Sequence, residues 1–181
     1  MITLVKVSVP ILIRKLLVKI LVYDSHKPAY IVAGKYVSRS YLSFDFALSF
    51  YGLIPEAVYV CTSATEHQSN YNFFVTKNGS FSYKHIPQKA FECGVNLIHE
   101  RGMSFRMASP EKALCDKLFL MPPVRTMNEM RELLEEDMRI DIDALLTLNV
   151  NMIKKLSKLY PSENVRKLGI FIERERLCIA K

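Results

Sequence analysis

The clearest pattern of apolar and polar positions in the chain lies at residues 109–120. Ala113, Leu114 and Leu118 recur at helical spacing and form one apolar stripe. Ser109, just before them, is a residue type that caps helix N-termini through its hydroxyl. The pattern therefore predicts a core helix in this stretch.

The polar positions of the same helix are expected on its outer side. Lys112 and Asp116 lie off the apolar stripe, so the sequence predicts that both face largely outward. Pro122 and Pro123 follow and end the helix, because proline has no N–H to donate and clashes with the preceding turn. We expect a structural helix here rather than a functional site.

Helical periodicity also predicts helices on both sides of this one. A short helix is expected over 29–37, and a core helix over 44–51 with Ser43 as its cap and Gly52 as its stop. The C-terminal third predicts a helical tail packed on one face of the sheet. Its expected helices are 126–138, 142–148, 149–160 and one from Val165, capped by Ser162-Glu163-Asn164.

The middle of the chain has the alternation and turn residues of strands. Asn78-Gly79 is a strong type I′ hairpin signal, and Arg101-Gly102 marks a second hairpin. The fold class predicted is α+β: a small antiparallel sheet of hairpins packed with helices, followed by a helical C-terminal part. The expected strands are 57–62, 71–76, 80–86, 95–99 and 104–108.

The first 23 residues are rich in Val, Ile and Leu, and Leu16 to Tyr23 has strong β propensity. Lysine and arginine interrupt every apolar run before it reaches the length of a membrane span, so no membrane association is predicted. The segment is expected to belong to the folded body or to pair with another chain. Two regions are predicted: 1–35 as an N-terminal segment, and 36–181 as an α+β body with a helical tail from about residue 124.

Charge changes this picture only modestly. The 181 residues include 25 Lys+Arg and 18 Asp+Glu, a formal net charge of +7. This balance is compatible with an anionic partner and equally with an evenly solvated basic surface. The candidate nucleic-acid-binding residues are Arg14, Lys15 and Lys19 near the N-terminus and Lys154, Lys155, Lys158, Arg166 and Lys167 in the last two predicted helices.

Candidate chemistry is sparse. Cys61, Cys93, Cys115 and Cys178 are too far apart for a zinc motif, and we expect reduced core cysteines in a cytoplasmic protein. The sequence has no phosphate-binding, dinucleotide or hydrolase motif, so it predicts no enzyme, cofactor or metal. The weaker alternative is a metal-dependent nuclease using the carboxylates Glu92 and Glu100, or Asp137, Asp141 and Asp143.

Four ordered blocks carry a resemblance to a known family. The blocks are Tyr41–Glu56, Thr62–Thr65, Gly79–Ile86 and Ala108–Leu114. Together they resemble the AbiEi-type antitoxins of bacterial abortive-infection toxin–antitoxin systems, which serve in phage defence. The likeness covers roughly residues 36 to 121. It implies an antitoxin and transcriptional regulator that binds operator DNA and opposes a nucleotidyltransferase-type toxin.

The chain departs from that family at its N-terminus. Family members typically carry a winged helix-turn-helix before this body, whereas only about 35 residues precede it here. At most the wing strand, around Ile13 to Tyr23, is expected to remain. The sequence therefore predicts no recognition helix that could read base pairs in the major groove. The alternative prediction is a protein–protein interaction module or homo-oligomer without DNA binding.

Overall fold

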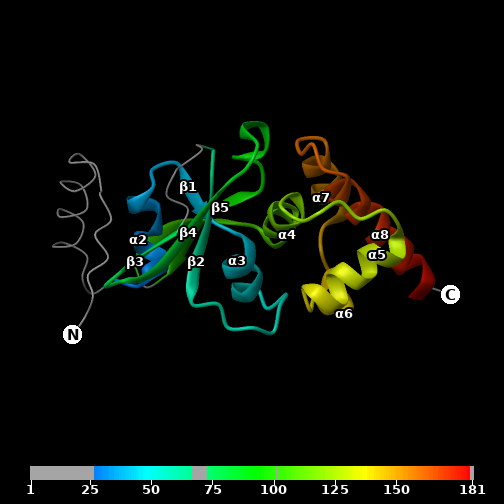
Figure 1. The fold of residues 1–181 in the computed structure, drawn as a ribbon, viewed down its shortest axis with the longest axis horizontal. Coiled ribbons are helices and arrows are strands. Elements are labelled where there is room, and N and C mark those ends of the chain that lie inside the picture. Colours follow the sequence, from blue (N-terminus) through cyan, green and yellow to red (C-terminus); the bar gives the residue numbers. More distant parts are fainter. Residues whose placement is uncertain (1–26, 67–72, 101, 180–181) are drawn as a thin grey trace.

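The computed structural model describes residues 27–66, 73–100 and 102–179 (Figure 1). Predictions for Arg14, Lys15, Lys19 and the wing strand fall outside these residues. Within them a six-stranded sheet lies at one end of the molecule and a group of helices at the other, with α4 (Pro110–Phe119) between the two. The α+β class and the helical C-terminal part are therefore confirmed.

The sheet is mixed rather than wholly antiparallel. Its strands are β1 (Ser40–Leu42), β2 (Val60–Thr65), β3 (Phe73–Thr76), β4 (Gly79–His85), β5 (Val95–Glu100) and β6 (Met103–Ala108). They lie in the order β3-β4-β2-β1-β6-β5. The two hairpins, β3–β4 and β5–β6, are antiparallel as predicted. Strand β1 was not predicted, and it pairs antiparallel with β2. However, β2 pairs with β4, and β1 with β6, in parallel. Turn residues reveal a hairpin but not how hairpins join, so the sequence missed these pairings.

Two local predictions in the sheet need correction. The turn of the first hairpin consists of Lys77 and Asn78, because Thr76 already pairs with Gly79. A turn centred on Asn78-Gly79 is therefore wrong, although Gly79 does adopt a positive φ of 135°. The strand expected over 57–62 begins three residues later and runs to Thr65.

Helices cover both faces of the sheet. On one face, α2 (Ala29–Tyr36) packs on β4, where the Tyr83 hydroxyl donates to the Ala33 carbonyl at 2.6 Å. On the other face, α3 (Phe44–Phe50) packs on β2, and the Thr62 side chain points toward it. Successive side chains of a strand point to opposite faces, so the residues on either side of Thr62 face α2. Since α2 crosses the boundary proposed at residue 35 and buries Ile31 and Val32 in the common core, the described end of the N-terminal segment packs with the body.

The C-terminal helices pack on α4 rather than on a face of the sheet. They are α5 (Met127–Glu132), the π-helical turn η2 (Leu133–Asp137), α6 (Ile142–Leu146), α7 (Val150–Ser157) and α8 (Glu163–Ile179). Helices α7 and α8 contact each other and α4 (Figure 1). Helices α5, α6 and α7 begin within one residue of the expected positions, and Thr126, Asp141 and Asn149 each cap the next helix through a side-chain oxygen.

Two further findings concern the cysteines and the membrane. Cys61 and Cys115 are buried as expected, but Cys93 is half-buried and Cys178 is exposed, so not all four belong to the core. All four are free thiols. In the described ranges, none of the helices has the length and apolar character that a membrane crossing requires.

Candidate functional site

The most unusual feature of the molecule is a buried ion pair on α4. Lys112 Nζ lies 2.9 Å from Asp116 Oδ1, and both side chains are 0% exposed. The prediction that these residues face outward was wrong. They occupy the side of α4 opposite its apolar stripe, and α7 with the following Tyr160 packs there. Because a buried charge is costly unless paired and hydrogen-bonded, the surrounding contacts decide what the pair does.

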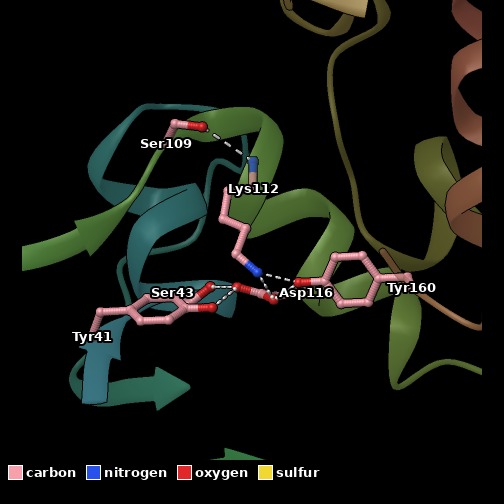
Figure 2. Close-up of polar contacts among 6 residues, drawn as sticks. All are labelled: Tyr41, Ser43, Ser109, Lys112, Asp116 and Tyr160. Atoms are coloured by element: carbon pink, nitrogen blue, oxygen red, sulfur yellow. Dashed lines mark hydrogen bonds and ion pairs between the residues drawn. The ribbon is translucent and has the colours of Figure 1, made fainter. Parts of the chain in front are cut away.

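Hydroxyl groups from both ends of the molecule complete the cluster (Figure 2). Asp116 Oδ2 accepts hydrogen bonds from Tyr41 at 3.0 Å and from Ser43 at 2.6 Å, both on the sheet side. Asp116 Oδ1 accepts from the Tyr160 hydroxyl, which also accepts from Lys112. We call these five residues, Tyr41, Ser43, Lys112, Asp116 and Tyr160, the junction cluster. It joins the sheet to the C-terminal helices through α4.

The backbone around Ser43 is shaped by this cluster. Ser43 occupies the N-cap position of α3, as predicted, but its hydroxyl makes no capping bond and donates to Asp116 instead. Phe44 then adopts a positive φ of 56°, a costly conformation for a residue with a side chain. Strand β2 holds this turn, because Thr62 accepts from the Ser43 N–H at 2.9 Å and its hydroxyl donates back to the Ser43 carbonyl.

The electrostatics keep the phenols of the cluster protonated. Burial, together with the negative charge of Asp116, raises the pKa of Tyr41 and of Tyr160 well above the ordinary value. Both therefore remain donors to Asp116. The Lys112 ammonium also lies 5.5 Å from the Tyr41 ring centre and 4.7 Å from that of Tyr160, within cation–π range.

Chemically, the junction cluster is a closed network. Its members are between 0% and 4% exposed, so they lie beyond the reach of a macromolecular partner. Burial also raises the pKa of the neighbouring Cys115 thiol, which keeps it protonated and unreactive. We conclude that the cluster positions the two ends of the molecule. The sequence offered one signal for it, the i,i+4 spacing of Lys112 and Asp116, but gave no reason to bury that pair.

A second buried contact crosses the same junction. The Asn164 side chain, on α8, donates to the carbonyls of Leu118, Met121 and Pro122, and it accepts from the Val124 N–H at 2.8 Å. These carbonyls lie at the end of α4 and in the following turn, where the regular helical hydrogen bonds end. The prediction that Asn164 helps to cap α8 was wrong, since α8 already begins at Glu163 and Asn164 closes α4 instead.

The predicted basic cluster is only partly available for binding. Lys154 pairs with Glu173 at 2.5 Å, Arg166 pairs with Glu163, and Lys167 donates to the backbone carbonyls of Val124 and Arg125. Lys155, on α7, and Lys158, at its C-cap, are exposed, and their ammonium groups have no partner within the described ranges. Thus two of the five C-terminal candidates present an unpaired charge to solvent.

A cleft of about 260 Å³ lies between α4 and the segments after α3 and η2. Ion pairs flank it: Lys117 with Asp45 at 2.7 Å, and Arg139 with Glu56 at 2.6 Å. The sequence did not predict this cleft, because its walls come from three separate segments. They comprise Asp45, Ile54, Glu56, Val58, Lys117, Met121, Asp137 and Met138.

The carboxylates considered for a nuclease are not gathered into one site. Glu92 pairs with Arg106 at 2.5 Å, and Asp141 caps α6 by accepting from the Asp143 N–H. Among the residues that the structure describes, no group of three or more His, Cys, Asp or Glu side chains is arranged to hold a metal ion.

Comparisons of the chain with protein-family models, with curated proteins and with solved structures found no match.

Proposed function

We propose that this chain is an antitoxin and transcriptional regulator of the AbiEi type that acts by binding rather than by catalysis. Its functional counterpart would be a nucleotidyltransferase-type toxin in the cytoplasm of a bacterium. The proposal begins from the resemblance of four ordered sequence blocks. The structure adds an observation about how those blocks are arranged.

The supporting observation is that three of the four blocks meet around one buried group, while the fourth, Gly79–Ile86, pairs through β4 with the strand that carries Thr62. Block Tyr41–Glu56 supplies Tyr41 and Ser43 to Asp116. Thr62, at the start of block Thr62–Thr65, fixes the backbone at Ser43, and block Ala108–Leu114 supplies Lys112. Segments that build one joint junction are required together, which explains why they would persist as an ordered set. This favours a shared fold, and through it a shared function, over chance similarity.

For the DNA part of the proposal, α7 is the candidate contact surface. Lys155 and Lys158 carry its two unpaired exposed ammonium groups. Lysines of this kind bind phosphates, displace counterions and give affinity that falls steeply with salt. They position a protein on a duplex but do not read its bases. We therefore expect binding to upstream DNA with strong salt dependence and modest sequence preference.

A salt-controlled mobility-shift assay on the chain's own upstream DNA tests this surface. The double variant Lys155→Glu, Lys158→Glu should bind more weakly, with a salt slope lower by about 2 because two phosphate contacts are lost. The matched control is Lys77→Glu, Lys89→Glu, which makes the same charge change at two exposed lysines beside the sheet. Lys77 lies in the turn between β3 and β4, and Lys89 lies between β4 and β5. Equal weakening by both variants would show a nonspecific charge effect and contradict the assignment.

The antitoxin part needs a separate measurement. Induction of a neighbouring nucleotidyltransferase toxin should arrest growth, and co-expression of this chain should restore it. The double variant at Lys155 and Lys158 separates the two roles, since rescue without DNA binding would assign regulation alone to α7. Failure of both rescue and DNA binding in the unaltered protein would reject the proposed function.

A second candidate function is a protein–protein interaction module or homo-oligomer without DNA binding. It is favoured by the outer face of α8, where Ile170 and Leu177, two helical turns apart, are 42% and 66% exposed. Light scattering after size exclusion should then show a dimer that Leu177→Glu dissociates. A monomer at high protein concentration would reject self-association.

A further inference from the structure

One part of the sheet lies bare in the described structure. Phe73 and Val75, on the edge strand β3, are 58% and 67% exposed. Through the register of the hairpin they flank Ser82 and Ser80, which are half-buried on β4. Helix α3 covers the neighbouring strand β2 but does not reach this part of the face. The outer end of the sheet therefore presents an aromatic and a β-branched side chain to solvent.

The opposite face of the same strand is fully used. Phe74 stacks on Phe81 and Tyr83 and meets Tyr36 of α2 edge-on. Strand β3 is thus firmly placed, and its exposed side chains are not a sign of a loosely held strand. Bare apolar side chains on an edge strand are a liability that folded proteins normally cover or interrupt with charge.

The chain enters the described fold beside this strand. The Lys27 carbonyl accepts a hydrogen bond from the Asn78 side chain at 3.1 Å, and Asn78 lies in the turn that joins β3 to β4. The residues before Lys27 therefore start at the end of β3. They include Leu16–Tyr23, eight residues of which six are aliphatic and one is tyrosine. The stretch has twice as many residues as β3. It is therefore long enough to span the strand even if four of its residues connect it to Lys27.

We propose that residues 16–23 dock on the exposed face of β3 and cover Phe73 and Val75. The occupant is this chain's own N-terminal segment because its apolar composition matches the bare face and its attachment point adjoins the strand. The assignment is independent of the proposed function. It places this stretch against the sheet whether or not Arg14 and Lys15 before it, or Lys19 within it, contact DNA.

Thiol labelling in the full-length chain tests the assignment. Val75→Cys is compared with Leu97→Cys, which lies on the opposite edge strand β5 at a similar exposure of 58%. Modification by a bulky maleimide, located by peptide mass, should be at least about tenfold slower at residue 75, because labelling must await undocking of the segment. In denaturant the two rates should become equal.

Charged substitutions in the segment provide the second arm. Residues four apart share a face in both strands and helices, so each of the double variants Leu16→Asp, Ile20→Asp and Leu17→Asp, Leu21→Asp changes one side of the segment. One of these double variants should raise the labelling rate at Val75→Cys to that at Leu97→Cys. Neither should change the rate at Leu97→Cys.

Two outcomes would overturn the proposal. Equal labelling rates at residues 75 and 97 in the native chain would show that nothing covers β3. Protection at residue 75 that grows with protein concentration, and that neither double variant removes, would identify a second copy of the chain as the occupant.

Discussion

The sheet body and the C-terminal helices handle polar side chains in opposite ways. In the C-terminal helices most polar contacts are exposed, both local ones such as the pair Arg131–Glu135 and contacts between helices such as Lys154–Glu173. Where the sheet and its helices α2 and α3, here called the sheet body, meet α4, the polar groups are buried. They join residues that are distant in sequence, as when Tyr41 and Ser43 donate to Asp116. Each exposed contact adds little stability, whereas the buried ones decide how the two ends of the molecule fit together.

The largest expected effect comes from removing the charge of Asp116. Asp116→Asn keeps the side-chain shape but leaves the Lys112 ammonium buried without a counter-charge, which should lower the free energy of unfolding by about 3–5 kcal/mol. Asp143→Asn, at an exposed position on α6, should cost under about 1 kcal/mol. Urea denaturation measures both.

A double variant shows whether the charge is the cause. Lys112→Met with Asp116→Asn removes the unpaired ammonium, so it should recover part of the stability lost in Asp116→Asn. If the double variant were less stable than Asp116→Asn, the loss would come from packing at α4 instead.

The junction cluster should also make stability fall at alkaline pH. Burial and Asp116 raise the pKa of Tyr41 and Tyr160 in the folded protein, so above about pH 10 these phenols ionise first in the unfolded chain. Their contribution is complete below that pH and declines as pH rises, by about 3 kcal/mol together at one unit above. Urea midpoints between about pH 8 and about pH 11 measure the decline.

Tyr160→Phe separates this effect from general alkaline unfolding. The variant should be less stable near neutral pH, because it loses hydrogen bonds to Lys112 and Asp116, but its stability should fall less steeply with pH. Tyr59→Phe, at a side chain that is 87% exposed, should leave the slope unchanged. An unchanged slope in Tyr160→Phe would exclude that phenol as a cause.

Asn164 links the helices to the junction and should show the next largest effect. Asn164→Ala removes one acceptor and the donor to three carbonyls at the end of α4, so we expect a loss of about 2 kcal/mol. Asn151→Ala, exposed on α7, should change stability by less than about 0.5 kcal/mol. Equal effects would mean that Asn164 contributes only through helix propensity.

The same division explains what the sequence could predict. Signals that act within a few residues were interpreted correctly: Ser109 accepts from the Lys112 N–H, and Gly52 takes the positive φ that ends α3. Both hairpins were found from their turn residues, although the turn type at Asn78 was not. Such signals fix an element because the donor and the acceptor are neighbours in the chain.

Predictions failed where a distant partner outweighed a local preference. Ser43 was expected to cap α3 and Asn164 to cap α8, yet both side chains turn to α4. Lys112 and Asp116 were expected outside because polar residues off an apolar stripe usually face water. The arrival of α7 and Tyr160 on one side, and of Tyr41 and Ser43 on the other, makes that side of α4 an interior surface. The candidate site was therefore less predictable than the helices that carry it.

The smallest effects compare two buried serines on the sheet body. Ser43 and Ser63 are 0% and 1% exposed, but the Ser43 hydroxyl donates to a carboxylate at 2.6 Å. Ser43→Ala should therefore lower the free energy of unfolding by about 2 kcal/mol, the usual worth of a hydrogen bond to a charged group. Urea denaturation of the variant measures this loss.

Ser63→Ala is the matched control, and it should act in the opposite direction. The Ser63 hydroxyl has no hydrogen-bond partner within the described residues, so its burial costs free energy that no contact offsets. Replacing it with a methyl group should leave stability unchanged or raise it by up to about 1 kcal/mol. If Ser63→Ala lowered the free energy of unfolding as much as Ser43→Ala, the hydrogen bond to Asp116 would not be the cause of the loss at Ser43. The contrast drawn between the junction and the rest of the sheet body would then fail.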